Sequence, residues 1–456
     1  MLFRPITSIT LICLLAGCHA SRIPFAQPPA VPFAPFLEQA AHTLASTQPP
    51  RPPSSGPETP SKGTLDQLEQ LALDNNPSLA ESRAWVEAAR GKWVQVGLPP
   101  NTVLGYSGQQ LGSGGTAEQQ GLFIGQEFIR GDKLDLNRSV AFHEIQKAEK
   151  LWAMQRQRVL TDIRLAYYQV LVAQRRNDTT GELVKIAQLA VETAETLLNA
   201  KEVSRVDVMR SRIELQATQL QLKNARSLSV AAWSRLVAVT GGGDMQPRQL
   251  DGDLENLPGH IDAIEALARL VSESPEMGVA SSDVERARRA VDRARAETVS
   301  NVDFQAIFQS DRATGSSNAN LQVSIPIPSR NRNEGGIQQA RAEVIAAERS
   351  LDRLELNFQQ RLAGVYHRYT TARNQAEDYS RNGGILANSG AALELIRKGY
   401  EAGEMTYLDL NTAQRTYSQT TLAYIESLGA LWAAVIEIEG LLLKGSLEND
   451  SLSPWQ

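Results

Sequence analysis

Residues that could make or break bonds are few and scattered in this chain of 456 residues. Two cysteines, Cys13 and Cys18, are too few for a disulfide scaffold or a cysteine-rich zinc fold. The glycine run 241–243 lacks the Lys-Ser/Thr pair of a phosphate-binding loop. The histidines and methionines form no cluster with metal-ligand spacing; the histidines are His19, His42, His143, His260 and His367. We therefore expect no catalytic residue, no metal site and no cofactor, and we predict that the chain is not an enzyme.

Cys18 is the one residue whose surroundings favour a covalent modification. Arg4, a short apolar run over residues 9–15 and the small residues before Cys18 have the layout of a secretory signal. The run is too short to be a permanent membrane helix. The string Leu15-Ala16-Gly17-Cys18 resembles the bacterial lipobox, in which cleavage precedes a cysteine that then carries lipid. We predict a signal peptide over residues 1–17 and lipidation of Cys18; the alternative is an ordinary signal peptide with an incidental cysteine.

Composition describes the rest of the chain in broad terms. Lysine plus arginine is 46 and aspartate plus glutamate is 51, a formal charge of −5, which does not favour a nucleic-acid partner. Residues 19–63 contain 11 of the 21 prolines. Such a segment is unsuited to regular structure, so we predict an extended linker over residues 18–63 behind the lipid anchor.

The body of the chain repeats itself at a nearly constant offset. Tyr167 corresponds to Tyr366, and residues 200–208 correspond to residues 402–410. We predict a duplication. Its parts are residues 64–243 and 258–444, with a connecting loop over 244–257 and a tail over 445–456. Each repeat has the same expected order of a helix, two strands, a long helix and a returning helix. The expected helices cover 65–98, 135–200 and 204–240 in the first repeat, and 261–299, 334–402 and 405–443 in the second.

The helical segments have a coiled-coil pattern. Apolar residues recur at steps of three and four along the predicted helices, a spacing that packs helices side by side. A helix of about 65 residues is roughly 100 Å long, far more than a globular domain requires.

Four segments alternate between apolar and polar residues, the period of a strand that is wet on one face. Their apolar members are Leu104 and Tyr106; Leu122, Ile124 and Phe128; Phe304, Ala306 and Phe308; and Leu321, Val323, Ile325 and Ile327. The polar members Gln305, Gln309, Gln322 and Ser324 are expected to face water. Each segment is long enough to cross a bilayer as a tilted strand. Four strands cannot close a membrane barrel, so several subunits must contribute strands to one barrel. Three copies give twelve strands, and below them twelve helical segments that form a second barrel. The alternative is a set of soluble hairpins that cap a helical bundle.

These features together resemble the TolC-like outer-membrane efflux proteins over about residues 64–444. The paired turns at 200–208 and 402–410 are specific to this family. Residues 126–133 and residues 323–335 look most like the cobalt–zinc–cadmium cation-efflux branch. The resemblance implies a mainly helical fold with a small β part, in which a homotrimer forms a 12-stranded β-barrel in the outer membrane on a 12-helix barrel in the periplasm. It also implies two protein partners, a periplasmic adaptor and an inner-membrane pump of the RND type. The implied function is a passive export channel, with heavy-metal cations as the expected cargo.

The resemblance also assigns roles to the two turns. It places the adaptor-docking tip at Lys201, Glu202, Ser204, Gly403, Glu404 and Thr406, and the channel entrance at Asp409, Thr412 and Asp207. Lys201 stands where the family prefers glycine, so one turn is expected to dock differently. Thr412 stands where some relatives have a second acidic residue, so a weaker acidic gate or a mostly steric one is expected. The simpler interpretation is that Ser204, Thr406 and the two aspartates only cap helices.

Two other functions stay open at this point. The same channel architecture could carry drugs, other small molecules or secreted polypeptides instead of cations. A periplasmic lipoprotein that uses its coiled coils as a spacer is the alternative from a different class, but a spacer has no use for strands with a lipid-facing side.

Overall fold

A computed structural model of the chain describes residues 63–448, apart from residues 113, 115, 117 and 244, together with residue 453. The predicted signal peptide, Cys18 and the linker up to residue 62 lie outside the described residues. The described part is mainly helical with one small sheet, as the sequence predicts.

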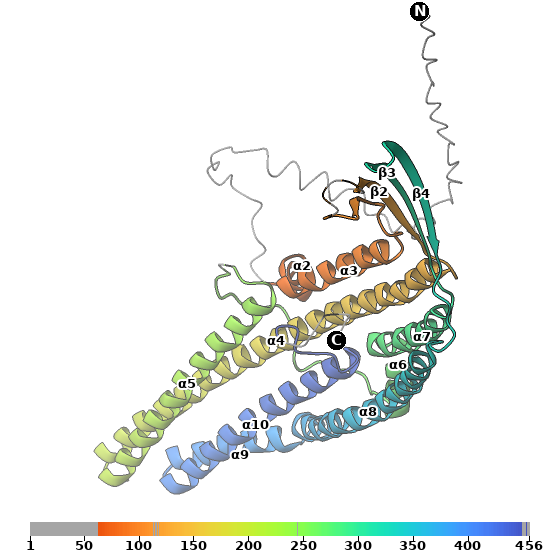
Figure 1. Cartoon of the computed structure of the whole chain (residues 1–456). Coiled ribbons are helices and arrows are strands. Elements are labelled where there is room, and N and C mark those ends of the chain that lie inside the picture. The colour runs from red at the N-terminus through yellow and green to blue at the C-terminus, as the bar shows by residue number, and fades with distance from the viewer. Residues whose placement is uncertain are drawn as a thin grey trace, which may run out of the picture. The chain divides into compact units, whose positions relative to one another are not determined.

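The two parts of the body have nearly the same order of elements (Figure 1). The first contains α2 (Leu65–Asn75), α3 (Pro77–Val96), β1 (Val103–Gln109), β2 (Gln119–Phe128), α4 (Lys133–Asn199) and α5 (Arg205–Val239). The second contains α6 (Ala263–Glu273), α7 (Pro275–Ala296), β3 (Val302–Asp311), β4 (Ser316–Ser324), α8 (Glu334–Ser380), α9 (Ile385–Glu401) and α10 (Tyr407–Glu439).

The predicted first helix of each part, 65–98 and 261–299, is wrong as a single helix, because each is divided before a proline. Asn76 and Ser274 have extended backbones, as expected for a residue that precedes proline. Each then caps the next helix: the Asn76 side chain accepts a hydrogen bond from the Ser78 amide, and the Ser274 hydroxyl accepts one from the Glu276 amide.

The predicted long helix over 334–402 is also divided, whereas its counterpart α4 is continuous for 67 residues. The break lies at residues 381–384, where Gly383 has a positive φ of 68°. Glycine adopts this left-handed backbone without the penalty that a Cβ brings, so α8 ends there and α9 begins after it. A continuous helix in only one part means that the two parts are similar but not identical.

Helices α4, α8 and α10 supply most of the core. Phe358 and Tyr369 on α8 are fully buried against Leu428 and Leu431 on α10. Among the described helices, α10 is long and apolar enough to cross a membrane, but 56% of its most apolar window is buried inside the protein. It is therefore accounted for as a core helix.

The sheet has the order β1-β2-β3-β4, with every neighbouring pair antiparallel. The central pair, β2 with β3, joins the two parts of the chain, and Leu122 lies opposite Phe308 in this pair. Strands β1 and β4 are the outer strands of this sheet, so each has one edge without a partner in the described chain.

Candidate functional site

One face of the sheet is apolar and uncovered. The strand register places the alternating apolar residues on the same face, because Leu104 lies opposite Ile124 and Ala306 lies opposite Leu321. Their exposed members are Leu104, Tyr106, Leu122, Ile124, Phe308, Leu321 and Val323. Leu104 is 73% exposed, and Leu321 is 67% exposed. The predicted apolar face is therefore confirmed, and no described element covers it.

The opposite face is mostly polar, with Phe123 and Ile307 among its polar side chains, and parts of it are buried. Gln309 is only 3% exposed; it donates to the Ser107 hydroxyl at 2.9 Å and accepts from the Asn320 amide at 3.3 Å. Gln305 and Gln322 line a concave region of about 400 Å³ on the same face. A soluble sheet buries its apolar side against a core, so this arrangement is reversed relative to what water favours. The reversal is typical of a sheet whose apolar side contacts lipid.

The ends of the α4–α5 and α9–α10 hairpins are the second candidate site, and they share one backbone geometry. In the first turn the Lys201 amide donates to the Leu198 carbonyl and the Glu202 amide to the Leu197 carbonyl. The second turn repeats this pattern, with Gly403 bonded to Tyr400 and Glu404 bonded to Gly399; the four distances lie between 2.8 and 3.1 Å. This paired pattern is a Schellman motif, which satisfies the last carbonyls of a helix.

Each returning helix then begins with a reciprocal capping box. The Thr406 hydroxyl accepts from the Asp409 amide, and the Asp409 carboxylate accepts from the Thr406 amide at 3.0 Å and from its hydroxyl at 2.6 Å. Ser204 and Asp207 make the same set of bonds at the start of α5. The predicted caps at Ser204 and Thr406 are thus confirmed, and both aspartates take part in them. The hydrogen bonds from Thr406 hold the pKa of Asp409 below its usual value.

The two turns differ at one matched position. Lys201 has φ +62° where Gly403 has φ +76°. Both residues therefore have a left-handed backbone, which strains a residue that carries a Cβ. The departure from glycine that the sequence reveals at Lys201 thus leaves the fold of the turn unchanged and adds strain to it.

The predicted site residues separate into two groups. Lys201, Glu202, Ser204 and Asp207 lie in the first turn, and Gly403, Glu404, Thr406, Asp409 and Thr412 lie in or just beyond the second. The two hairpin ends run side by side (Figure 1). Thr412 is exposed and donates its hydroxyl to the Leu408 carbonyl of its own helix at 2.8 Å. All these residues lie at one end of the helices, but Asp207 and Asp409 belong to separate caps.

Sequence reasoning missed the contacts that join the two hairpin ends. Tyr400 and Tyr407 are buried in a cluster that also contains Leu410 and contacts Val203 of the first turn. Burial, followed by the nearby charge of Asp207, raises the pKa of Tyr400 to about 12. Tyr400 precedes the turn and Tyr407 follows it, so the helical spacing within either segment gave no signal for this contact.

An ion pair adds a second link between the hairpins. Arg415 on α10 donates to Glu214 on α5 with nitrogen–oxygen distances of 2.8 and 3.1 Å. Glu214 is largely buried, whereas Arg415 is exposed, so the pair lies at the border of the contact. The two ends are therefore connected by apolar contact and by charge.

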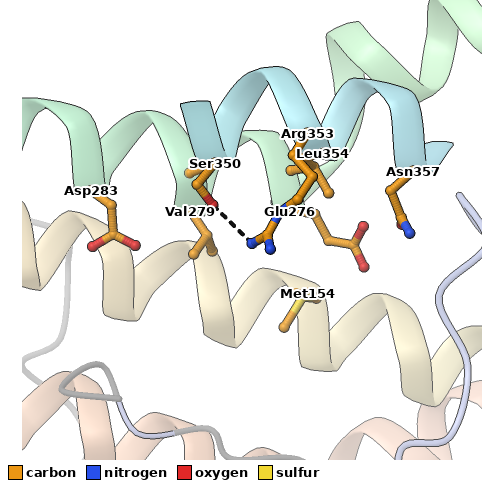
Figure 2. Close-up of a pocket in the computed structure, with 9 residues that line it drawn as sticks. Met154, Glu276, Val279, Asp283, Ser350, Arg353, Leu354 and Asn357 are labelled. Carbon is orange, nitrogen blue, oxygen red and sulfur yellow. Dashed lines mark hydrogen bonds between the residues drawn. The ribbon is translucent and has the colours of Figure 1, made fainter. Parts of the chain in front are cut away.

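A cleft of about 470 Å³ lies between α4, α7 and α8 (Figure 2). Two carboxylates, Glu276 and Asp283, point into it, but each already has a cation: Arg361 lies 2.8 Å from Glu276, and Lys147 lies 3.1 Å from Asp283. Across the described part of the chain, no three side chains of histidine, cysteine, aspartate or glutamate gather in a way that could hold a metal ion. This cleft is therefore not a candidate metal site.

Comparisons with known proteins agree with this architecture. The chain is 23% identical to the cobalt-zinc-cadmium resistance protein CzcC of Cupriavidus metallidurans, over 83% of this chain and 90% of that protein. It is 25% identical to the protein CyaE of Bordetella pertussis, over 88% of this chain and 90% of that one. Its fold is similar to that of the outer-membrane channel OprN, with a TM-score of 0.70 at 19% identity over 84% of this chain and 91% of the other.

A family model for outer membrane efflux proteins matches residues 68–242 and 266–442, which are most of the described body. The two matched ranges correspond to the two parts that share one order of elements. The chain therefore belongs to the outer membrane efflux protein family.

Proposed function

We propose that this protein is the outer-membrane channel of a tripartite efflux system and that it conducts its cargo passively. The observation that carries the proposal is the sheet with its apolar face exposed and its polar face partly buried. That face needs lipid, and the free edges of β1 and β4 need strands from other copies. A homotrimer meets both needs with a 12-stranded barrel built on a 12-helix barrel, and the duplicated halves 64–243 and 258–444 supply the strands and helices.

The two hairpin ends are the proposed entrance and docking tip. Lys201, Glu202, Ser204, Gly403, Glu404 and Thr406 are proposed to contact a periplasmic adaptor that links the channel to an RND-type pump. Asp207, Asp409 and Thr412 are proposed to line the entrance, where a threefold ring of carboxylates would attract cations and repel anions. Lipidation at Cys18 would anchor the mature chain beside the barrel.

Heavy-metal cations are the proposed cargo, because the relative CzcC is named for cobalt, zinc and cadmium resistance. Efflux of drugs or other small molecules is the second candidate. We propose that selection among cargoes takes place in the pump, because the described residues contain no metal site. Metal tolerance of cells that express the channel with a cognate pump, compared with their drug tolerance, separates the two cargoes.

The purified mature protein in a planar bilayer tests the channel itself. We expect a trimer that survives mild detergent and gives single-channel conductance, with small and infrequent openings while the tip is closed. Asp409→Asn should weaken cation preference, whereas the exposed helix variant Asp352→Asn should not. If a variant with shortened hairpin ends also fails to conduct, the strands do not form a barrel and the periplasmic spacer becomes the better function.

A further inference from the structure

Three exposed arginines lie where the sheet meets the long helices. Arg130 follows the end of β2, and Arg330 and Arg332 lie between β4 and α8. Strands β2 and β4 run in the same direction, so their C-terminal ends lie at the same end of the sheet. We call these three residues the junction arginines.

The junction arginines continue directly from the apolar face. Phe128, at the end of β2, is 53% exposed, and Ile325 and Ile327 after β4 are 50% and 84% exposed. An arginine therefore follows the last exposed apolar side chain of each strand within two or three residues. Apolar surface that ends in arginine is suited to a membrane boundary, because the long side chain keeps its stem in apolar surroundings and its charge in the headgroup layer.

The backbone that carries two of these arginines is well held. The Ser300 hydroxyl donates to the Pro326 carbonyl, and the Asn333 side chain donates to the Ala294 carbonyl at 2.8 Å. The Asn331 side chain, between the two arginines, accepts from the Asn333 amide at 3.0 Å. Arg330 and Arg332 therefore project from a fixed segment.

The charges of the junction arginines are not neutralised within the described chain. None of the three guanidinium groups has a carboxylate within ion-pair distance among the described residues. Lys133, the basic residue that follows Arg130 in sequence, is in contrast buried and has polar partners. Its ammonium lies 2.9 Å from the Asn301 side chain and 3.7 Å from the Glu297 carboxylate. Asp132 and Glu334 each lie two residues beyond a junction arginine in sequence, and neither forms an ion pair with it.

We propose that the junction arginines bind the anionic phospholipid headgroups of the leaflet that faces the helical barrel. Charge complementarity and the continuity with the exposed apolar face identify this occupant. The proposal rests on the proposed membrane-spanning function. It adds that arginine–phosphate contacts at this boundary fix the depth of the barrel in the bilayer. A trimer would contribute nine such arginines.

Spin-labelled phosphatidylglycerol and phosphatidylcholine provide the test, with the full mature chain reconstituted in phosphatidylcholine vesicles. The motionally restricted fraction of each probe gives the relative association constant of the two lipids. Each guanidinium attracts an anionic headgroup by a charge interaction that salt screens, so we expect the wild type to prefer phosphatidylglycerol at low salt and to lose that preference at high salt. The triple variant R130Q/R330Q/R332Q should bring the ratio close to one at low salt.

The control is R226Q/R235Q/R353Q, which removes the same charge from exposed positions on α5 and α8. The proposal holds if this control keeps the wild-type preference and the junction variant loses it. It is overturned if the junction variant keeps the preference or if both variants lose it equally. Conductance measured with the same vesicles distinguishes a failure of this inference from a failure of the proposed function. If the protein conducts but shows no preference between the two lipids, only this inference is overturned. If it neither conducts nor restricts the motion of any lipid probe, the proposed function is overturned as well.

Discussion

The hairpin ends allow a matched test of backbone strain, because they share the paired hydrogen bonds of the Schellman motif and differ at the residue with the left-handed backbone. A non-glycine residue in this conformation costs about 1–2 kcal/mol. Replacing that residue by glycine removes this strain, but glycine loses more conformational freedom on folding, which costs about 0.5–1 kcal/mol of stability. Lys201→Gly should therefore stabilise the first turn by roughly 0.5–1 kcal/mol. Gly403→Lys should destabilise the second turn by a similar amount, because a Cβ at Gly403 would meet no atom within 4 Å and only backbone strain is added.

Hydrogen–deuterium exchange reports this change at the turns themselves. The Glu202 amide donates to the Leu197 carbonyl at 2.9 Å, and the Glu404 amide donates to the Gly399 carbonyl at 2.8 Å. A change of 0.5–1 kcal/mol alters the exchange rate of such an amide about two- to fivefold. Exchange at Glu202 should slow in Lys201→Gly, and exchange at Glu404 should accelerate in Gly403→Lys.

Gly364→Ala is the control, because Gly364 lies inside α8 and a Cβ there meets open space. It should raise helix stability by about 0.8–1 kcal/mol and leave both turns unchanged. The reasoning is refuted if Lys201→Gly leaves exchange at Glu202 unchanged or faster, since the left-handed backbone would then carry no strain.

Three further predictions concern the sheet and the tip. Leu321→Arg should cost about 2–4 kcal/mol per chain in a membrane if its face contacts lipid, whereas the neighbouring Gln322→Arg on the polar face should cost little; folding into vesicles in urea measures both. The pKa of Asp409 is lowered in the folded protein, so its capping bonds stabilise the turn above the unfolded pKa and are lost as the pH falls through the lower folded value. The protection factor of the Asp409 amide, which is its exchange rate relative to that of an unstructured peptide at the same pH, should therefore fall in acid, and a protection factor that stays constant with pH would contradict this. Tyr400→Phe should raise the melting temperature, because it removes a buried hydroxyl that has no hydrogen-bond partner among the described residues and with it about 1 kcal/mol of desolvation cost; a lower melting temperature would reveal a partner from another copy.

Periodicity predicted the elements of this fold well, and local backbone chemistry determined where the predictions were wrong. The alternating residues of the strands placed Leu104, Leu122, Phe308 and Leu321 on one face, because a period of two has only two possible registers. Ile325 and Ile327 were expected to continue the last strand, but β4 ends at Ser324 and both residues lie beyond it. The helix over 65–98 was expected to continue through Pro77, although proline disfavours a helical residue before it. The break at Gly383 was missed because an apolar seam continues on both sides of it, and periodicity alone does not register a short interruption.

The tip shows why site residues are harder to predict than elements. Ser204 and Thr406 were correctly expected to cap helices, since capping depends on neighbours within three residues. The contact between Tyr400 and the first turn, and the ion pair of Arg415 with Glu214, join residues about two hundred positions apart. Such contacts depend on how two hairpins pack, which a single sequence does not specify. The proposed roles of Asp409 and Lys201 in docking and gating are therefore predictions that conductance and binding experiments must decide.

The sheet places two demands on its surroundings, and these demands are linked. Its apolar face stabilises the protein only in contact with lipid, while the open edges of β1 and β4 are costly there because lipid offers no hydrogen bonds to unpaired amides. A single chain therefore cannot satisfy the face without exposing the edges. In the proposed trimer, pairing β1 of one copy with β4 of the next would remove the edges and leave the apolar face outward. Trimer formation and membrane insertion should consequently be gained and lost together, so a variant that blocks edge pairing should yield neither a detergent-stable trimer nor conductance.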